Sequence, residues 1–148
     1  MRGLKNYVAL NLPRALCLCS VANESSTEGS IDKMGSNLAT EVKKFIKDWC
    51  FSRDGTTMHL KKISFISHSL GGLIVRSALP RLEELKDFFH GFLSLGSPHL
   101  GYMYNSNSLV NAGMWFLKQW KRSQCLSELS MTDSMQEKCS YLYKLSKQ

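Results

Sequence analysis

A serine flanked by small residues lies near the middle of the chain, between an apolar run and a helical pattern. Ile63–Ile66 is apolar apart from one serine, and residues 67–72 read SHSLGG. A nucleophilic serine sits on a tight, strained turn that lifts its hydroxyl clear of the sheet, and the residues two positions away on either side must be small. Ser67 and Gly71 satisfy that requirement. The pattern therefore predicts Ser69 as a nucleophile with positive φ, on a strand–turn–helix unit.

The residues after Ser69 are suited to stabilise the oxyanion that forms when a serine attacks a carbonyl. The backbone N–H of Leu70 would donate to that oxyanion, and the positive end of the following helix would point at it. Gly72 would let this helix pack closely on its strand. The alternative is an ordinary serine-rich loop, because a bare Gly-x-Ser-x-Gly arises by chance in about one such chain in twenty. The apolar strand patterns before and after the motif favour the catalytic interpretation.

None of the four histidines is well placed as the base that would activate Ser69. His68 is its neighbour, but adjacent side chains on a tight turn diverge. His90 falls within an apolar strand pattern and is expected as a satisfied core residue. His99 is expected to brace a Pro-His turn, and His59 to be exposed before the strand.

The acidic residues are no better placed to complete a catalytic triad. In enzymes with this type of turn the chain order is serine, then acid, then histidine. The acids that lie between Ser69 and a later histidine all fall in the first crossover after the serine: Glu83, Glu84 and Asp87. Asp133 falls in a polar loop and is expected to be solvated. The sequence therefore assigns neither the base nor its acid.

The elements that position Ser69 alternate between helix and strand patterns. Apolar periodicity predicts helices at 4–10, 38–49, 71–79, 109–121 and 141–147, and strands at 15–21, 63–66 and 88–95. The clearest helix places five apolar residues on one face: Leu38, Val42, Phe45, Ile46 and Trp49. Asp32 or Ser36 would cap it, and a turn is expected at 53–56. The alternation predicts an α/β fold with a mostly parallel sheet flanked by helices.

The bulk composition is that of one globular domain of 148 residues with a formal net charge of +7. Basic surfaces attract nucleic acid or anionic lipid, but no nucleic-acid-binding signature is present, so no nucleic acid partner is expected. Five irregularly spaced cysteines are a poor disulfide framework. Cys17 and Cys19 are expected as buried thiols in a reducing, cytoplasmic compartment. No cofactor, metal site or membrane-spanning segment is expected.

Two segments are similar to the serine esterase, lipase-like family of α/β-hydrolases (DUF676 type). Residues 65–76, FISHSLGGLIVR, resemble the family's nucleophile elbow, and residues 92–101, FLSLGSPHLG, resemble its strand and Pro-His-x-Gly turn. Similarity over 105–121 and 141–147 points to a eukaryotic branch of lipase-like proteins, family with sequence similarity 135. The resemblance covers nearly the whole chain. It implies a partial α/β-hydrolase fold and a lipase-like serine hydrolase that cleaves a carboxylic ester in lipid metabolism.

The chain departs from the pattern of that family at three points. Ser67 stands where the family has glycine, and its side chain would crowd the turn. The family's strand with a His-Gly loop, which supplies a second oxyanion donor, comes before the part that Leu4–Leu10 matches. Its acid and histidine come after the part that the chain matches. Residues 1–148 are therefore expected to form a single partial domain without these segments. The alternatives are an inactive interaction module of the same fold and a truncated isoform.

An aromatic and basic helix is expected over residues 109–121. Its apolar residues and the cations beside them are Trp115, Phe116, Leu117, Trp120, Lys118, Lys121 and Arg122. Core packing with a basic rim is the favoured interpretation, and an interfacial lid that touches lipid is the alternative. The expected partners are thus an ester or lipid substrate, with peripheral membrane contact as the alternative use of this helix.

Overall fold

Helices and two strands alternate in the computed structural model, which describes residues 2–25, 29–50, 59–101, 124–131 and 133–147. In chain order the elements are α1 (Arg2–Asn11), α2 (Ile31–Cys50), β1 (Ile63–His68), α3 (Gly71–Ala78), the 3₁₀ helix η1 (Leu79–Phe88), β2 (Phe89–Leu95), α5 (Gln124–Leu129), the 3₁₀ helix η2 (Glu137–Cys139) and α6 (Tyr141–Leu145). The predicted helix over 109–121 and the predicted turn at 53–56 lie outside the described residues.

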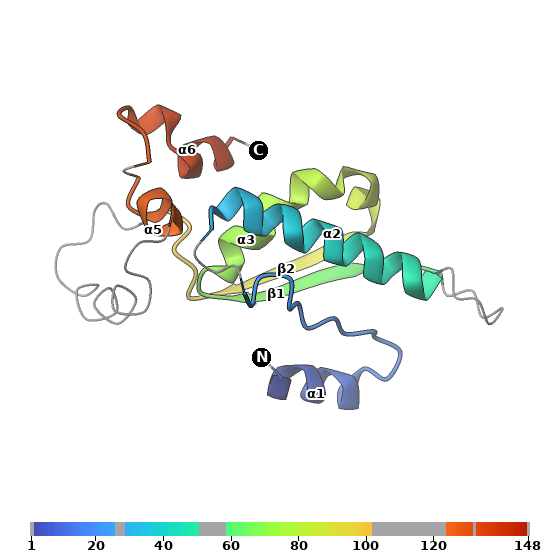
Figure 1. The fold of residues 1–148 in the computed structure, drawn as a ribbon. Coiled ribbons are helices and arrows are strands. Elements are labelled where there is room, and N and C mark those ends of the chain that lie inside the picture. Colours follow the sequence, from blue (N-terminus) through green and yellow to red (C-terminus); the bar gives the residue numbers. More distant parts are fainter. Residues whose placement is uncertain (1, 26–28, 51–58, 102–123, 132, 148) are drawn as a thin grey trace.

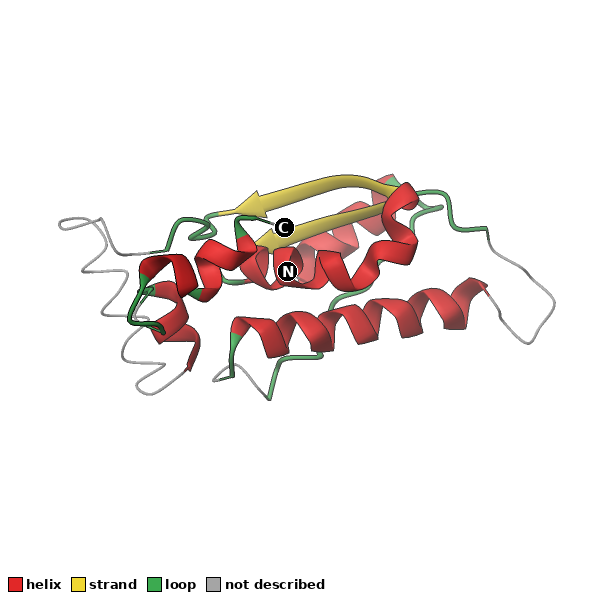
Figure 2. Cartoon of the chain, turned by 90° about the horizontal axis from the view of Figure 1, so that it is seen from above, coloured by secondary structure: helices red, strands yellow, loops and turns green. Residues whose placement is uncertain are grey.

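The two strands form a parallel pair that the helices α3 and η1 connect. Phe65 pairs with Phe92 and Ser67 with Ser94, so both strands end at the same edge. Helices α2 and α3 lie on one side of the pair, and α1 lies on the other (Figure 1). The view from above shows α3 beside the strands and α2 beyond it (Figure 2). The predicted α/β class, as a partial fold with a parallel sheet, is confirmed.

Helix α2 packs along α3 and forms much of the core with it. Leu38 and Val42 of its predicted apolar face are buried against α3, while Trp49 at its far end is exposed. The helix begins earlier than predicted, because Ile31 and Met34 of its first turn are fully buried apolar residues. Neither predicted residue caps it.

The N-terminal cap of α2 is Ser30, whose hydroxyl accepts the Lys33 N–H at 3.1 Å. Asp32, one of the two predicted caps, lies inside the helix and accepts instead from Arg81 at 2.7 Å. Ser36, the other predicted cap, also lies within the helix. The cap was misplaced because the apolar face extends one turn further toward the N-terminus than its periodicity indicated.

The strand predicted at 15–21 is wrong, because this segment follows α1 without regular structure. A strand needs a neighbour for its backbone hydrogen bonds, and β1 and β2 pair only with each other in the described part of the chain. Leu16 and Val21 are exposed, and Cys17 and Cys19 are half-buried rather than buried. The segment is held to α2, because the Val21 N–H donates to a Glu41 carboxylate oxygen at 3.0 Å. No helix within the described ranges is long and apolar enough to cross a membrane.

The other predicted helices and strands begin and end within a few residues of the observed elements. Helix α1 ends before Pro13, and β2 covers nearly the predicted range. Helix α3 ends at Ala78, one residue before the predicted end at Leu79, and the chain continues as η1 with Pro80 in its first turn, where a proline is tolerated. The predicted last helix is α6, where the Ser140 hydroxyl accepts the Tyr143 N–H.

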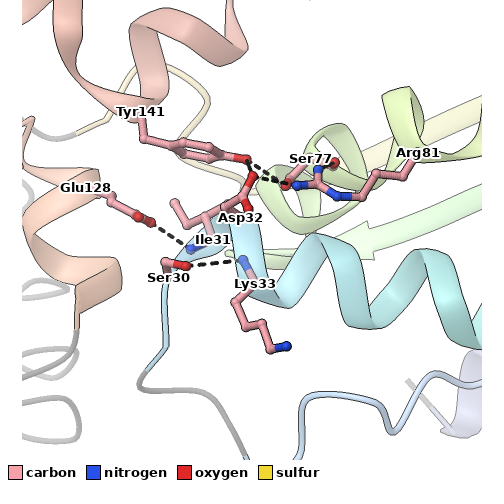
Figure 3. A network of polar contacts seen from close by, with 8 residues as sticks. All are labelled: Ser30, Ile31, Asp32, Lys33, Ser77, Arg81, Glu128 and Tyr141. Atoms are coloured by element: carbon pink, nitrogen blue, oxygen red, sulfur yellow. Dashed lines mark hydrogen bonds and ion pairs between the residues drawn. The ribbon is translucent and has the colours of Figure 1, made fainter.

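The C-terminal segment is held against the start of α2 by polar contacts between residues far apart in sequence (Figure 3). The buried carboxylate of Glu128 on α5 accepts the Ile31 N–H at 2.7 Å. Tyr141 Oη contacts Ser77 Oγ at 2.7 Å and donates to Asp32 at 3.2 Å. Apolar side chains of α5 and α6 pack around these contacts, in a cluster that includes Ile31, Met34, Leu70, Leu73, Cys125, Leu129, Leu142 and Leu145.

Burial raises the pKa of Glu128 above its ordinary value of 4.5, the Ile31 N–H opposes that rise, and the negative charges of Asp133 and Asp32 add to it. Because the folded-state pKa is the higher one, the contribution of Glu128 to stability is fully present below the unfolded pKa and is lost as pH rises through the folded pKa. The pKa of Cys125, beside it, is raised to about 12, mainly by burial.

Glu128→Gln is therefore expected to be at least as stable as the wild type at neutral pH. The amide oxygen still accepts the Ile31 N–H, and the buried charge is gone. Glu128→Ala, by contrast, leaves that N–H without a partner, which costs about 1–3 kcal/mol. Urea unfolding from mildly acidic to neutral pH measures both. A stability of Glu128→Gln that falls relative to the wild type as pH rises would contradict this account.

Candidate functional site

Ser69 occupies the turn between β1 and α3. Its φ is +53°, in the left-handed region that is strained for a residue other than glycine. Its N–H donates to the Leu95 carbonyl at the end of β2 (2.9 Å), and its carbonyl accepts the Gly72 N–H (3.2 Å). The predicted junction and the predicted positive φ are confirmed, although β1 continues to His68, slightly further than expected.

The Ser69 hydroxyl and the Leu70 N–H have no hydrogen-bond partner among the residues that the structure describes. Leu70 is the residue before the first turn of α3, with helical φ and ψ of −53° and −27°. A backbone N–H at this end of a helix is a suitable donor to an anion, because the helix dipole is positive there. The arrangement can therefore supply a nucleophile and an oxyanion donor at one place.

The small residues around Ser69 have different roles in packing. Ser67 is buried, and its hydroxyl donates to the Leu93 carbonyl of β2 at 3.4 Å. A Cβ added to Gly71 would lie 3.5 Å from Ser67 Cβ, which is an ordinary van der Waals contact. The expectation that the Ser67 side chain crowds the turn is therefore wrong. A Cβ on Gly72 would lie 2.3 Å from Ser97 Oγ. The same Cβ would lie 2.5 Å from Ser94 Oγ, so Gly72 lets α3 approach β2 and the turn after it, rather than β1 as predicted.

None of the chain's four histidines forms a hydrogen bond with Ser69, although all four and Ser69 itself are described. His68 and His59 are exposed. The expectation that His90 belongs to the core is wrong: it is exposed on β2, with its Nδ1 3.5 Å from Ser64 Oγ. The register of the sheet shifts at this point, so His90 has no paired residue on β1 and is turned outward.

His99 braces the turn after β2, as predicted. Its Nε2 lies 2.8 Å from Ser94 Oγ, and its Nδ1 lies 3.5 Å from Nη1 of Arg76 on α3. Burial and then the charge of Arg76 lower the pKa of His99 below its ordinary value. Sequence reasoning did not find Ser94, Ser97 or Arg76 as partners. The short spacing of the two serines and His99 was a usable signal, but Arg76 is 23 residues away.

Carboxylates among the acidic residues considered for a triad form ion pairs or hydrogen bonds at the protein surface. Glu84 forms an ion pair with Lys43 at 2.7 Å, and this hydrogen bond lowers its pKa. Glu83 pairs with Lys86 at 2.9 Å within η1. Asp133 is exposed, as predicted, and accepts a backbone N–H at the start of α6. Across the described ranges, no group of histidines, cysteines and acids is arranged to hold a metal ion.

A parallel α/β layer with a strained serine between strand and helix is typical of serine esterases. The chain belongs to the family described as "Putative serine esterase (DUF676)", whose model matches residues 2–148. It is also similar to "Lecithin-cholesterol acyltransferase-like 4" of Arabidopsis thaliana, with 31% identity over 87 residues, which are 57% of this chain and 16% of that relative. The chain thus spans only a small part of that relative's length. No solved structure matches.

Proposed function

We propose that this chain carries the nucleophilic centre of a lipase-like carboxylic ester hydrolase, with Ser69 as the nucleophile and Leu70 N–H as an oxyanion donor. The observation that carries this proposal is the φ of +53° at Ser69, at the point where β1 ends and α3 begins. Such strain is stored at functional turns, and on a turn of this type the serine hydroxyl stands clear of the end of the sheet. In these terms residues 67–71 are a nucleophile elbow.

In the reaction that we propose, Ser69 Oγ attacks the carbonyl carbon of the ester and its proton passes to a base. The tetrahedral intermediate places its negative oxygen at the Leu70 N–H, and the bond to the alcohol then breaks as the alcohol takes that proton. Water hydrolyses the acyl-serine in the reverse sense and releases the acid. Since none of the four histidines forms a hydrogen bond with Ser69 in this structure, we assign no residue to the base or to its acid partner.

A lipid ester is the substrate class that we propose, and the similarity to a relative named for lecithin and cholesterol supports it. The resemblance of residues 105–121 and 141–147 to family with sequence similarity 135 supports that branch. The irregular spacing of five cysteines favours a cytoplasmic location. Peripheral contact with a membrane would bring a basic chain to such a substrate.

One observation favours a second candidate, an interaction module of the same fold without catalytic activity. His99 directs its ring nitrogens to Ser94 and Arg76 rather than to Ser69, so the chain holds no formed serine–histidine pair at the elbow. In this case Ser69 would keep its strained backbone for packing alone.

Labelling with a fluorophosphonate distinguishes the two candidates. We expect a slow reaction that is selective for Ser69, since the Leu70 N–H assists the attack, and we expect no such adduct in Ser69→Ala. The matched control is Ser64→Ala, which removes an exposed hydroxyl on β1, the strand that precedes Ser69, and should leave the labelling unchanged. Peptide mapping by mass spectrometry locates the adduct. An adduct spread evenly over several serines, or retained in Ser69→Ala, would remove the support for catalysis.

A further inference from the structure

Four polar side chains link the end of β2 to α3 immediately beside the elbow. Ser94 Oγ donates to Ser97 Oγ at 2.7 Å and lies 2.8 Å from His99 Nε2. His99 Nδ1 lies 3.5 Å from Arg76 Nη1, and Arg76 Nη2 donates to the Leu145 carbonyl of α6 at 3.1 Å. All four side chains are partly buried. We call this set the Arg76–His99 clamp: Arg76, Ser94, Ser97 and His99.

The chemistry of these groups allows only one direction for the hydrogen bonds. A guanidinium can only donate, so His99 Nδ1 must present its lone pair to Arg76. In the neutral ring the proton is then on Nε2 and is donated to Ser94 Oγ. The Ser94 hydroxyl, having accepted there, donates onward to Ser97. Each of the three contacts from Arg76 through His99 and Ser94 to Ser97 thus joins a donor to an acceptor.

This direction is opposite to the one that a catalytic base requires. A histidine that takes a proton from serine needs a free lone pair on the nitrogen facing the hydroxyl and an N–H that faces an acid. In His99 the nitrogen facing the hydroxyl carries the proton, and the other nitrogen faces a cation. The ring of Phe92 is packed edge-on against His99 at 6.4 Å and offers no charge. Arg76 is the charged group that acts on the titration of His99.

The clamp acts on the backbone that holds Ser69. Leu95, which follows Ser94, accepts the Ser69 N–H at 2.9 Å. On the other side, a Cβ on Gly72 would lie 2.5 Å from Ser94 Oγ, so the start of α3 is in direct contact with the clamp. The end of β2, the turn after it and the first turn of α3 are therefore fixed together around the elbow.

We propose that Arg76, His99, Ser94 and Ser97 are positioning residues that hold the Leu95 carbonyl, and through it the strained backbone of Ser69, by a hydrogen-bond chain of fixed direction. The relevance of this role to catalysis rests on the proposed function of Ser69. The clamp itself is a property of the fold and is measurable whether or not Ser69 reacts.

The tautomer of His99 gives the first test. ¹⁵N NMR of the histidine rings in the full chain should show His99 as the neutral Nε2–H form at neutral pH, and burial together with the charge of Arg76, which lower its pKa, should keep it neutral into the mildly acidic range. Arg76→Met removes the donor and the charge, so the pKa of His99 should rise and both tautomers should appear. Arg81→Met, an arginine with no contact to His99, should change neither.

Amide hydrogen exchange at Ser69 gives the second test. Ser94→Ala and His99→Ala each interrupt the series of hydrogen bonds in the clamp. The Ser69 N–H should then exchange about threefold to tenfold faster, as expected for the loss of one hydrogen bond. His99→Gln should restore the wild-type rate, because its amide accepts from Arg76 and donates to Ser94. His90→Ala, at the opposite end of β2, is the control. If His99→Ala does not fold, Ser94→Ala and the NMR measurement still decide the question.

An Nδ1–H tautomer in the wild type, or a Ser69 exchange rate unchanged by Ser94→Ala, would overturn the clamp. Failure of the proposed function would look different. The fluorophosphonate would then not select Ser69, while the tautomer and the exchange rates would remain as described.

Discussion

This chain alone is expected to hydrolyse p-nitrophenyl butyrate at a rate close to the uncatalysed background. Loss of a triad member typically leaves an acceleration of only about 10³–10⁴ over water, which comes from the oxyanion hole and substrate binding. Loss of one oxyanion donor costs about 10²–10³ more. Leu70 N–H is the donor that we assign, and no histidine forms a hydrogen bond with Ser69. The two effects together leave Ser69 with an acceleration of only about tenfold, which the Leu70 N–H supports.

Added imidazole should restore part of the activity, because it can take the proton that no side chain accepts. The signal is the imidazole-dependent rate of the wild type minus that of Ser69→Ala, which removes the hydrolysis that imidazole catalyses by itself. Ser64→Ala should behave as the wild type. Rapid turnover without imidazole that Ser69→Ala abolishes would show that a histidine of this chain reaches Ser69 in solution.

Replacing Gly35 with alanine is expected to lower the free energy of unfolding by about 1–2 kcal/mol. A Cβ at this position of α2 would lie 2.2 Å from Ser77 Oγ and 2.9 Å from the Ser77 backbone carbon. Ser77 is fully buried and its hydroxyl contacts Tyr141 Oη, so it cannot move aside without cost. The better helix propensity of alanine offsets about 1 kcal/mol of the overpacking.

Gly3→Ala is the matched control for this substitution, since Gly3 also lies in a helix and a Cβ there would meet nothing within 4 Å. It should leave stability unchanged or raise it slightly. Thermal unfolding followed by circular dichroism measures both variants, and Gly35→Ala should lower Tm by about 2–8 °C. Equal Tm values for the two variants would mean that α2 and α3 are packed less closely than described.

The parts of the fold that could be predicted are those that depend on neighbouring residues. The apolar run of β1, the small residues of the elbow and the start of α3 lie next to one another in sequence, so the strained φ of Ser69 was predictable. The residues at 15–21 have the same apolar character as a strand, but their conformation depends on a partner strand. The prediction that Cys17 and Cys19 are buried was wrong for the same reason, because it depended on that strand.

The contacts around the site were beyond sequence reasoning where they join distant segments. Nothing local to Glu128 indicates that its carboxylate caps a helix that begins 97 residues earlier. The outward direction of His90 follows from a register shift between two strands, which periodicity does not reveal. Likewise, Arg76 looks like an ordinary basic residue near the end of a helix until His99 is placed beside it.

The hydrogen bond from Ile31 to Glu128 also has a consequence for the order of folding. It closes a loop of 97 residues, and ordering such a loop costs about 4 kcal/mol of chain entropy, which later contacts must recover. The contacts among α2, β1, α3 and β2 involve shorter separations and can form first. During synthesis, the first turn of α2 is therefore covered only on the side that faces α3, and the part of its apolar surface that α5 and α6 cover stays exposed to solvent until residues 124–147 have left the ribosome.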